Sequence, residues 1–100
     1  MENRLQLVAG IIERDAIRYT PAGTPVVTAK LRHRSQQTEA ETERIVEFEI
    51  PATAIGKIAG QLEKLEAGQI QRFTGFMAKK SRKSNMLVFH ITGIAPMDQK

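Results

Sequence analysis

Four cations lie within five residues of the segment FMAKKSRKSNMLVF, residues 76–89. They are Lys79, Lys80, Arg82 and Lys83, and apolar runs flank them on both sides. The chain has 15 basic and 11 acidic residues, so these four account for its net charge of +4. A local cationic patch on a small domain favours a polyanionic partner. A loop kept charged for solubility is the alternative, and charge alone does not separate the two.

A second basic set occurs in PVVTAKLRHRS, residues 25–35. Lys30, Arg32 and Arg34 follow one another at every second position, so on a strand their side chains leave the same face. Such a set favours nucleic acid over a membrane surface, because no amphipathic helix presents an apolar face beside the cations. Single strands are favoured over duplex, because no helix has the basic residues needed to enter a major groove.

Residues suited to catalysis are few and scattered. His33 and His90 are the only histidines, and neither has a carboxylate or a second histidine at metal-ligand spacing. Glu47 and Glu49 share one strand face beside basic neighbours, which is typical of a solvated surface rather than of acid–base chemistry. GKIAG, residues 56–60, lacks the spacing of a phosphate-binding loop. The sequence predicts a protein that is not an enzyme and has no metal site and no cofactor.

Length and composition limit the class of protein. The 100 residues, 41% of them apolar, predict a single domain over 1–100. No cysteine is present, so the fold does not depend on disulfides. No apolar run approaches the ~18 residues of a membrane span, and the first residues lack a signal-peptide layout. We expect a soluble, cytoplasmic protein without a membrane partner.

The first half of the chain predicts three strands. Apolar residues alternate over 4–14, where Gly10 is expected to mark a bulge or bend. TPAGTP at 20–25 is a turn, and a second strand follows over 25–35. After a polar loop at 35–43, a third strand covers 44–51 and ends at its proline. The residues expected to face inward are Leu5, Leu7, Ala9, Ile11, Val27, Ala29, Leu31, His33, Val46, Phe48 and Ile50.

The apolar period then changes to that of a helix. Ile55, Ile58, Leu62 and Leu65 form a stripe that predicts a short helix within 52–66. Thr53 is the expected N-cap and Gly68 the expected C-terminal stop. Fourth and fifth strands follow over 69–78 and 86–95, with Gly75 inside the fourth, and residues 96–100 are expected to fray.

Three strands, one helix and two strands predict an all-β fold: a five-stranded antiparallel OB-fold barrel with one short helix between strands 3 and 4. An open α+β sheet is the rival. In an OB barrel the face of strands two and three binds oligonucleotides, and the loop between strands four and five covers it. The two cationic sets would then converge on one groove.

Base stacking is less clearly indicated. The best candidate is Tyr19, beside Arg18 and just before the turn; the alternative is a turn residue resting on the barrel rim. Phe48 and Phe89 are expected in the core. Phe73 and Phe76 lie on opposite strand faces, so one is expected in the core and the other at an interface.

The acidic residues of the third strand oppose this binding. If the hairpin register places Glu47 and Glu49 beside Lys30 and Arg32, cross-strand ion pairs will compete with phosphate for the same cations. We therefore expect modest affinity.

Several segments, in this order and spacing, resemble the primosomal replication protein N family, small bacterial relatives of single-stranded DNA-binding protein. They are NRLQLVAGII, LRHRS, EFEIP, GFMAKKSRKSN and FHITGI, and the resemblance covers almost the whole chain. It implies an OB-fold homodimer that binds single-stranded DNA and acts in restarting stalled replication forks. It also implies contacts with the primosomal helicase (protein N′) and, in some bacteria, with a further primosomal loading protein.

The resemblance also assigns residues. The cations at 79–83 match the family's DNA-contacting loop, and Arg34 matches the basic end of its second strand. The family's better-studied members have an aromatic on the third strand, where this chain has Thr42 and Glu47. This departure puts stacking at that position in doubt.

Three hypotheses follow. The first is a non-catalytic single-stranded DNA-binding protein coupled to a restart helicase. The second is a protein-docking adaptor of the primosome with incidental DNA binding, suggested by the acidic stretch Glu39, Glu41 and Glu43. The third is an RNA-binding OB module. The candidate nucleic-acid-binding residues are Arg18, Tyr19, Lys30, Arg32, Arg34, Lys79, Lys80, Arg82 and Lys83.

Overall fold

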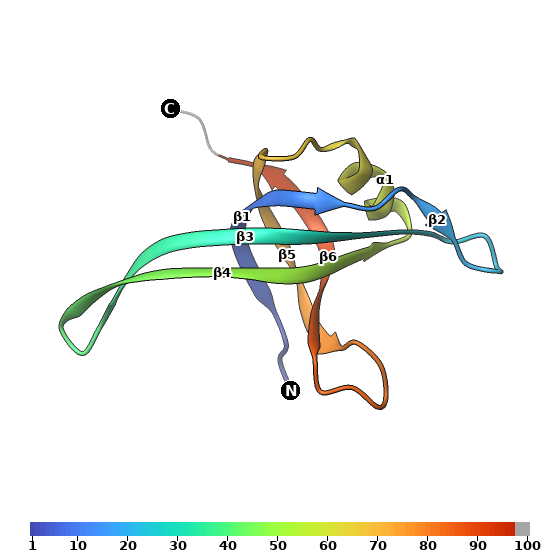
Figure 1. Cartoon of the computed structure of the whole chain (residues 1–100). Helices are drawn as coiled ribbons and strands as arrows, with labels where there is room; N and C mark the ends of the chain where they lie inside the picture. Colours follow the sequence, from blue (N-terminus) through green and yellow to red (C-terminus); the bar gives the residue numbers. More distant parts are fainter. Residues whose placement is uncertain (98–100) are drawn as a thin grey trace.

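Six strands and one helix make up the fold in the computed structural model, which describes residues 1–97 (Figure 1). Their order along the chain is β1 (Leu5–Arg14), β2 (Arg18–Tyr19), β3 (Pro25–Glu39), β4 (Thr42–Ile55), α1 (Lys57–Lys64), β5 (Ile70–Lys79) and β6 (Leu87–Pro96). The two-residue β2 was not predicted; it pairs with the start of β3 across the expected turn at 20–25. No helix within residues 1–97 is long and apolar enough to cross a membrane.

Strand β1 closes the barrel by changing partner midway. Its first half pairs with β5 and its second half with β3, and Gly10 belongs to both pairings. The bulge comes just after this glycine, between Ile11 and Glu13. The predicted five-stranded barrel, with one short helix between its third and fourth main strands, is confirmed.

One seam departs from the prediction of a fully antiparallel sheet. Strands β4 and β6 run parallel, with Ala52 to Ala54 opposite Phe89 to Ile91. The other pairings are antiparallel. The reason is the connection between them. After β4 the chain passes through α1 and returns along β5, which is antiparallel to β6, so β6 runs in the same direction as β4.

The barrel core contains most of the residues that alternation predicted. The largest fully buried side chains are Phe73, Phe89, Ile11, Leu31, Leu62 and Val27. Of the Phe73–Phe76 pair, Phe73 is the core member and Phe76 is exposed. The prediction for Phe48 is wrong: this side chain is 39% exposed, because its part of β4 extends beyond the barrel.

The expected loop at 35–43 is instead the tip of a long hairpin. Strands β3 and β4 pair without interruption from Val26 opposite Ile55 to Glu39 opposite Thr42. Ala40 and Glu41 join them with φ of 51° and 64°, as a two-residue hairpin turn requires. We call residues 32–49 the arm, because beyond Arg32 strand β3 pairs only with β4 (Figure 1).

The helix begins later than predicted. Pro51 does not end the third strand; β4 continues to Ile55, and Thr53 is a buried strand residue instead of an N-cap. The N-cap is Gly56, whose φ of 90° favours glycine. Pairing with β3 and β6 gives residues 52–54 more buried contact than a first helical turn would.

Two predictions at chain turns also change. Gly68 does not stop the helix, whose C-cap is Leu65; its N–H donates to the Ile11 carbonyl at 2.7 Å and ties the loop before β5 to the barrel. Pro96 is the last residue of β6, so the fraying expected from 96 is wrong there. The rest of that prediction, at 98–100, lies outside the described residues.

Gly75 lies where β5 and β6 approach most closely. A bulge shifts the register between Thr74 and Gly75, and a Cβ added at Gly75 would lie 1.8 Å from the His90 carbonyl oxygen. At Gly10 an added Cβ would meet nothing closer than 3.6 Å. Of these two strand glycines, only Gly75 leaves no room for a side chain.

Candidate nucleic-acid interface

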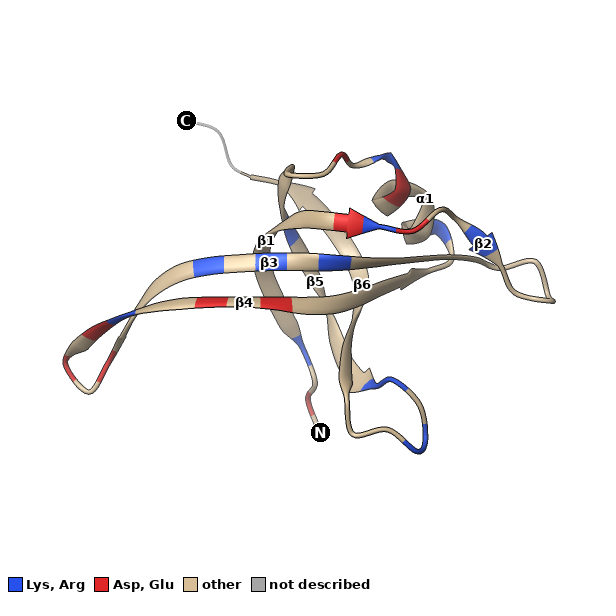
Figure 2. Ribbon diagram, viewed as in Figure 1, with Lys and Arg blue, Asp and Glu red and all other residues tan. Residues whose placement is uncertain are grey.

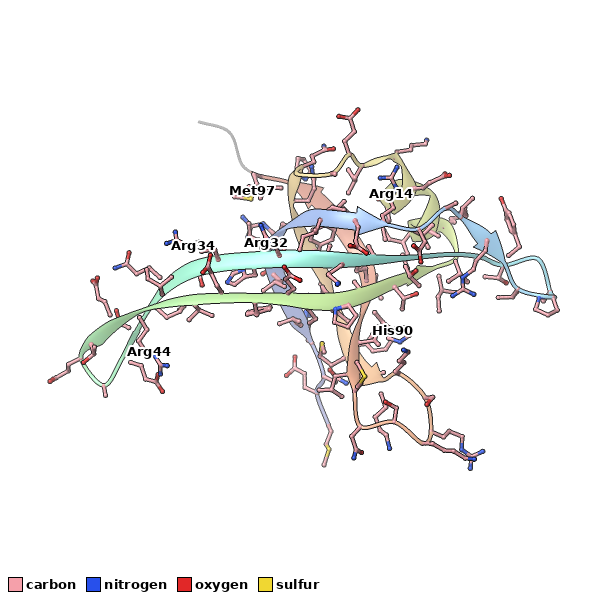
Figure 3. The ribbon with its side chains drawn as sticks, in the orientation of Figure 1. Arg14, Arg32, Arg34, Arg44, His90 and Met97 are labelled. Carbon is pink, nitrogen blue, oxygen red and sulfur yellow. The ribbon has the colours of Figure 1, made fainter. Side chains whose placement is uncertain are left out.

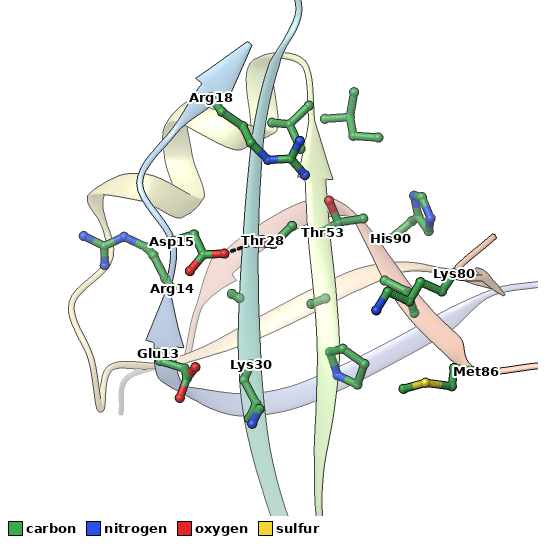
Figure 4. A pocket seen from close by; sticks show the side chains of 16 residues that line it. Glu13, Arg14, Asp15, Arg18, Thr28, Lys30, Thr53, Lys80, Met86 and His90 are labelled. Carbon is green, nitrogen blue, oxygen red and sulfur yellow. Dashed lines mark hydrogen bonds between the residues drawn. The ribbon is translucent and has the colours of Figure 1, made fainter. Parts of the chain in front are cut away.

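A cleft of about 630 Å³ crosses the outer face of β3 and β4 (Figure 4). The β1–β3 connection bounds it on one side and the β5–β6 loop on the other. Its floor is a row of outward-facing residues on three neighbouring strands, because Thr28 pairs with Thr53 and Thr53 with His90. This is the OB-fold face on which oligonucleotides bind.

Three cations from three different elements line the cleft. Arg18 comes from β2, Lys30 from β3 and Lys80 from the β5–β6 loop, and they surround the two threonines of the floor (Figure 4). None of them has a carboxylate oxygen within 4.0 Å among the described residues. These cations are therefore available to an anionic ligand.

Other charged groups at the cleft are already engaged. Asp15 accepts a hydrogen bond from the Thr28 hydroxyl at 2.7 Å. Arg14 donates to the Leu65 carbonyl, which holds its guanidinium toward the helix end. Glu13 also lines the cleft and reduces its positive charge.

Arg32 and Arg34 do not line this cleft. They border a second hollow of about 370 Å³, formed with residues of β1 and Ile70. Each is paired across the arm, Arg32 with Glu49 at 3.1 Å and Arg34 with Glu47 at 3.2 Å. Figure 2 shows the alternating basic residues of β3 beside the acidic residues of β4.

The register thus changes which cation is neutralised. The sequence indicated ion pairs only if the register placed Glu47 and Glu49 beside Lys30 and Arg32, and Arg32 is paired with Glu49. Lys30 lies opposite the uncharged Pro51 on β4 and opposite Glu13 on β1, but no carboxylate oxygen of the described residues lies within 4.0 Å of its ammonium group. The predicted strand set is therefore divided: Lys30 lines the cleft, whereas Arg32 and Arg34 lie on the arm (Figure 3).

The basic loop contributes one cation, Lys80, to the cleft. The N–H of Lys80 donates to the Met86 carbonyl at 2.8 Å, which closes the loop and sets both residues at the cleft edge. Lys79 ends β5, and its Nζ donates to the Arg82 carbonyl at 3.3 Å. Arg82 and Lys83 are exposed at the loop tip and do not line the cleft.

The aromatic residues are placed differently from the prediction. Tyr19 is 64% exposed on β2 and does not line the cleft. His90 does line it, and its ring stacks on Phe76 with centroids 5.0 Å apart. Sequence reasoning took His90 for an ordinary barrel residue, although strand alternation next to buried Phe89 already places it on the outer face.

Metal-ligand clusters are not a feature of this surface. Within residues 1–97 no three His, Cys, Asp or Glu side chains gather as potential ligands of one ion.

Comparison with known proteins yields one family and consistent relatives. Residues 3–93 match a family described as "another single-strand binding protein family". Replication restart protein PriB of Nitrosomonas europaea is 42% identical over 91 residues, which is 89% of this chain and 84% of that protein. PriB of Neisseria gonorrhoeae is 39% identical over 92% of this chain and 91% of its own length.

Solved structures agree. PriB from Ralstonia solanacearum superposes with a TM-score of 0.88 at 45% identity, covering 98% of this chain and all of that one. A deletion mutant of the single-stranded DNA-binding protein from Thermus aquaticus has a TM-score of 0.76 at 22% identity, over 97% of this chain and 51% of that one. The second likeness concerns the fold alone.

Proposed function

The chain belongs to the family of replication restart protein PriB, within the single-strand binding proteins, and on this premise we propose that it is a non-catalytic single-stranded DNA-binding protein of replication restart. The strand lies in the cleft across β3 and β4. The observation that carries the proposal is the convergence of Arg18, Lys30 and Lys80 on that cleft without carboxylate partners.

The chemistry of the cleft suits a phosphate backbone. Three cations come from separate elements, and a polyanion that neutralises them releases condensed counterions. The outer cations Lys79, Arg82 and Lys83 extend this field beyond the cleft edge and attract the strand from solution. Arg32 and Arg34 join only when phosphate displaces their glutamates, so their contribution is small.

The test is a titration of labelled oligonucleotides followed by fluorescence anisotropy at several salt concentrations. We expect single-stranded DNA to bind more tightly than duplex of the same length. With three to six cations engaged, the log–log salt slope should be about −2 to −4. Equal affinity for duplex, or a flat salt dependence, would refute cleft binding.

RNA is the competing ligand within the same mechanism, because phosphates are common to both nucleic acids. Competition between ribo- and deoxyribo-oligonucleotides of one sequence separates the two. Preference for the ribo-oligonucleotide would replace this proposal by an RNA-binding module.

We propose further that the protein couples to the primosomal helicase (protein N′) and, where present, to a further primosomal loading protein. The arm offers a surface for such partners: Glu39, Glu41 and Glu43 are exposed at its tip, away from the cleft. This acidic tip is also the observation that favours a docking adaptor as the second candidate function. Binding to the helicase that persists at high salt without DNA would support the adaptor.

We also propose a homodimer. Residues 5–9 of β1 pair with β5 on one edge and with no strand on the other within the described chain, although His33 caps the Val8 carbonyl. Exposed Ile45 and Phe48 add apolar surface on the arm. Leu7 is buried in the barrel, so this segment would meet a second copy through its backbone edge. A monomer in sedimentation at micromolar concentration would contradict the dimer.

A further inference from the structure

Phe76 and His90 form a stacked pair of rings on the outer face of the barrel. Their centroids are 5.0 Å apart and their planes differ by 7°. The two residues pair directly across β5 and β6, so the rings stand side by side on neighbouring strands. Phe76 is 39% exposed, so its ring is not fully covered by the barrel.

The backbone around the pair is built to bring the strands together. The register shift at Thr74 and Gly75 lies immediately before Phe76. Gly75 leaves no room for a Cβ, since that atom would lie 1.8 Å from the His90 carbonyl oxygen. The close approach of β5 to β6 holds Phe76 against one face of the imidazole ring.

The other side of His90 borders the cleft. Its neighbour across the β4–β6 seam is Thr53, and Thr28 follows on β3. Both side chains are small, and the Thr28 hydroxyl is turned to Asp15. Space therefore remains in the row beside the imidazole, within the cleft that Arg18, Lys30 and Lys80 also line (Figure 4).

We propose that His90, backed by Phe76, is a stacking platform for one base of the bound strand. The base lies above Thr53 and continues the stack of the two rings, while phosphates on either side reach Lys30 and Lys80. Bases of any identity present a flat π face, so the platform adds affinity without sequence preference. The inference rests on the proposed function. Thr42 and Glu47 of β4 have no aromatic ring to stack on a base, and the proposed stacking residue lies on β6 instead.

Substitutions at His90 separate stacking from charge. His90→Ala should weaken binding of an oligo-dT strand about 5- to 100-fold and leave the salt slope unchanged, because a base contact releases no counterions. His90→Phe keeps an aromatic ring and should restore affinity, whereas His90→Lys supplies a cation without a ring and should not. Phe76→Ala should produce a smaller loss, since the imidazole remains without its support.

An abasic oligonucleotide tests the contact directly. Wild-type protein should lose affinity for an oligonucleotide with abasic residues through its centre, and His90→Ala should lose little more. As a second readout, 2-aminopurine in the strand should be quenched on binding to wild type and less so with His90→Ala. Thermal unfolding of each variant checks the fold, and His90→Phe and His90→Lys carry the comparison if His90→Ala is unstable.

The outcomes are distinguishable. Wild-type affinity in His90→Ala, or recovery by His90→Lys together with a changed salt slope, would overturn the platform and leave DNA binding intact. Failure of the wild-type protein to bind any single strand would instead overturn the proposed function.

Discussion

The cleft and the arm carry the same kinds of cation in opposite electrostatic settings. In the arm, Arg32, Arg34 and Arg44 are each paired with a glutamate, and these are the three ion pairs of the described chain. At the cleft, Arg18, Lys30 and Lys80 have no such partner. Counting basic residues along a strand therefore overstates the charge available to a ligand, because cross-strand neighbours decide it.

The difference arises from register in a single hairpin. Across this hairpin, Lys30 lies opposite Pro51 while Arg32 and Arg34 lie opposite Glu49 and Glu47. On its other side Lys30 lies opposite Glu13 of β1, with which it forms no ion pair. All of these ion pairs are largely exposed, so each stabilises the fold by only about 0.2–1 kcal/mol. A phosphate can displace such a pair, but it must first separate the arginine from its glutamate.

The largest effect is expected from Gly75→Ala, which should disrupt the contact of β5 with β6 beside the cleft and leave the arm unchanged. The new Cβ would overlap the His90 carbonyl, and relief requires β5 and β6 to separate. We expect a loss of at least about 2 kcal/mol in the free energy of unfolding. Thermal unfolding measures it. Gly10→Ala is the matched control, and equal losses in both variants would contradict the steric account.

Removing the cleft cations tests the comparison itself. Arg18→Ala, Lys30→Ala and Lys80→Ala together should flatten the log–log salt slope for single-stranded DNA by about 2, at ~0.7 for each phosphate contact. The control variant replaces Arg32, Arg34 and Arg44 by alanine, with the same change in net charge. Anisotropy titrations in a salt series compare the two. A steeper loss in the control would place the DNA on the arm.

Freeing the arm cations should make the arm resemble the cleft in the charge that it offers to DNA. With Glu47→Gln and Glu49→Gln, Arg32 and Arg34 become available, so affinity should rise and the salt slope should steepen by up to about 1.4. Lost ion pairs should cost stability about 0.2–1 kcal/mol each. Glu63→Gln with Glu66→Gln on the helix side controls for net charge. Identical binding in both double variants would mean that DNA does not reach the arm.

The smallest effect concerns the arm turn. Ala40 and Glu41 adopt positive φ, which asparagine and glycine tolerate better. Ala40→Asn with Glu41→Gly should stabilise the protein by about 0.5–1 kcal/mol without changing affinity for single-stranded DNA. Denaturant unfolding and anisotropy check the two halves of this prediction. A change in affinity would show that the arm tip takes part in binding.

Local pattern was enough to predict most of the barrel. Alternation identified the inward faces of β1 and β3 and the buried Phe89, and it placed one of Phe73 and Phe76 in the core without saying which. Turn chemistry located the 20–25 connection, and the change of period located a helix after the third main strand. These features depend on residues close together in the chain, so a single sequence contains them.

Other features depended on partners distant in the chain. Thr53 fits an N-cap and Ile55 a helical stripe, yet pairing with β3 and β6 draws 52–54 into the barrel wall. Polar residues at 35–43 indicated a loop, yet the pairing of β3 with β4 continues through them to Glu39 and Thr42. Local propensity loses in both cases because backbone pairing across the sheet satisfies groups that a helix or loop would leave to water.

By itself, the sequence determined most strand faces of the barrel, the turn at 20–25, the order of its main strands and helix, and the location of its cations along the chain. Tertiary structure alone decided which of those cations meet at one cleft, which are paired with glutamates, and that His90 stands between Phe76 and the cleft floor. The physical reason is that side-chain period is a property of neighbours in sequence, whereas register and closure are set by the whole sheet.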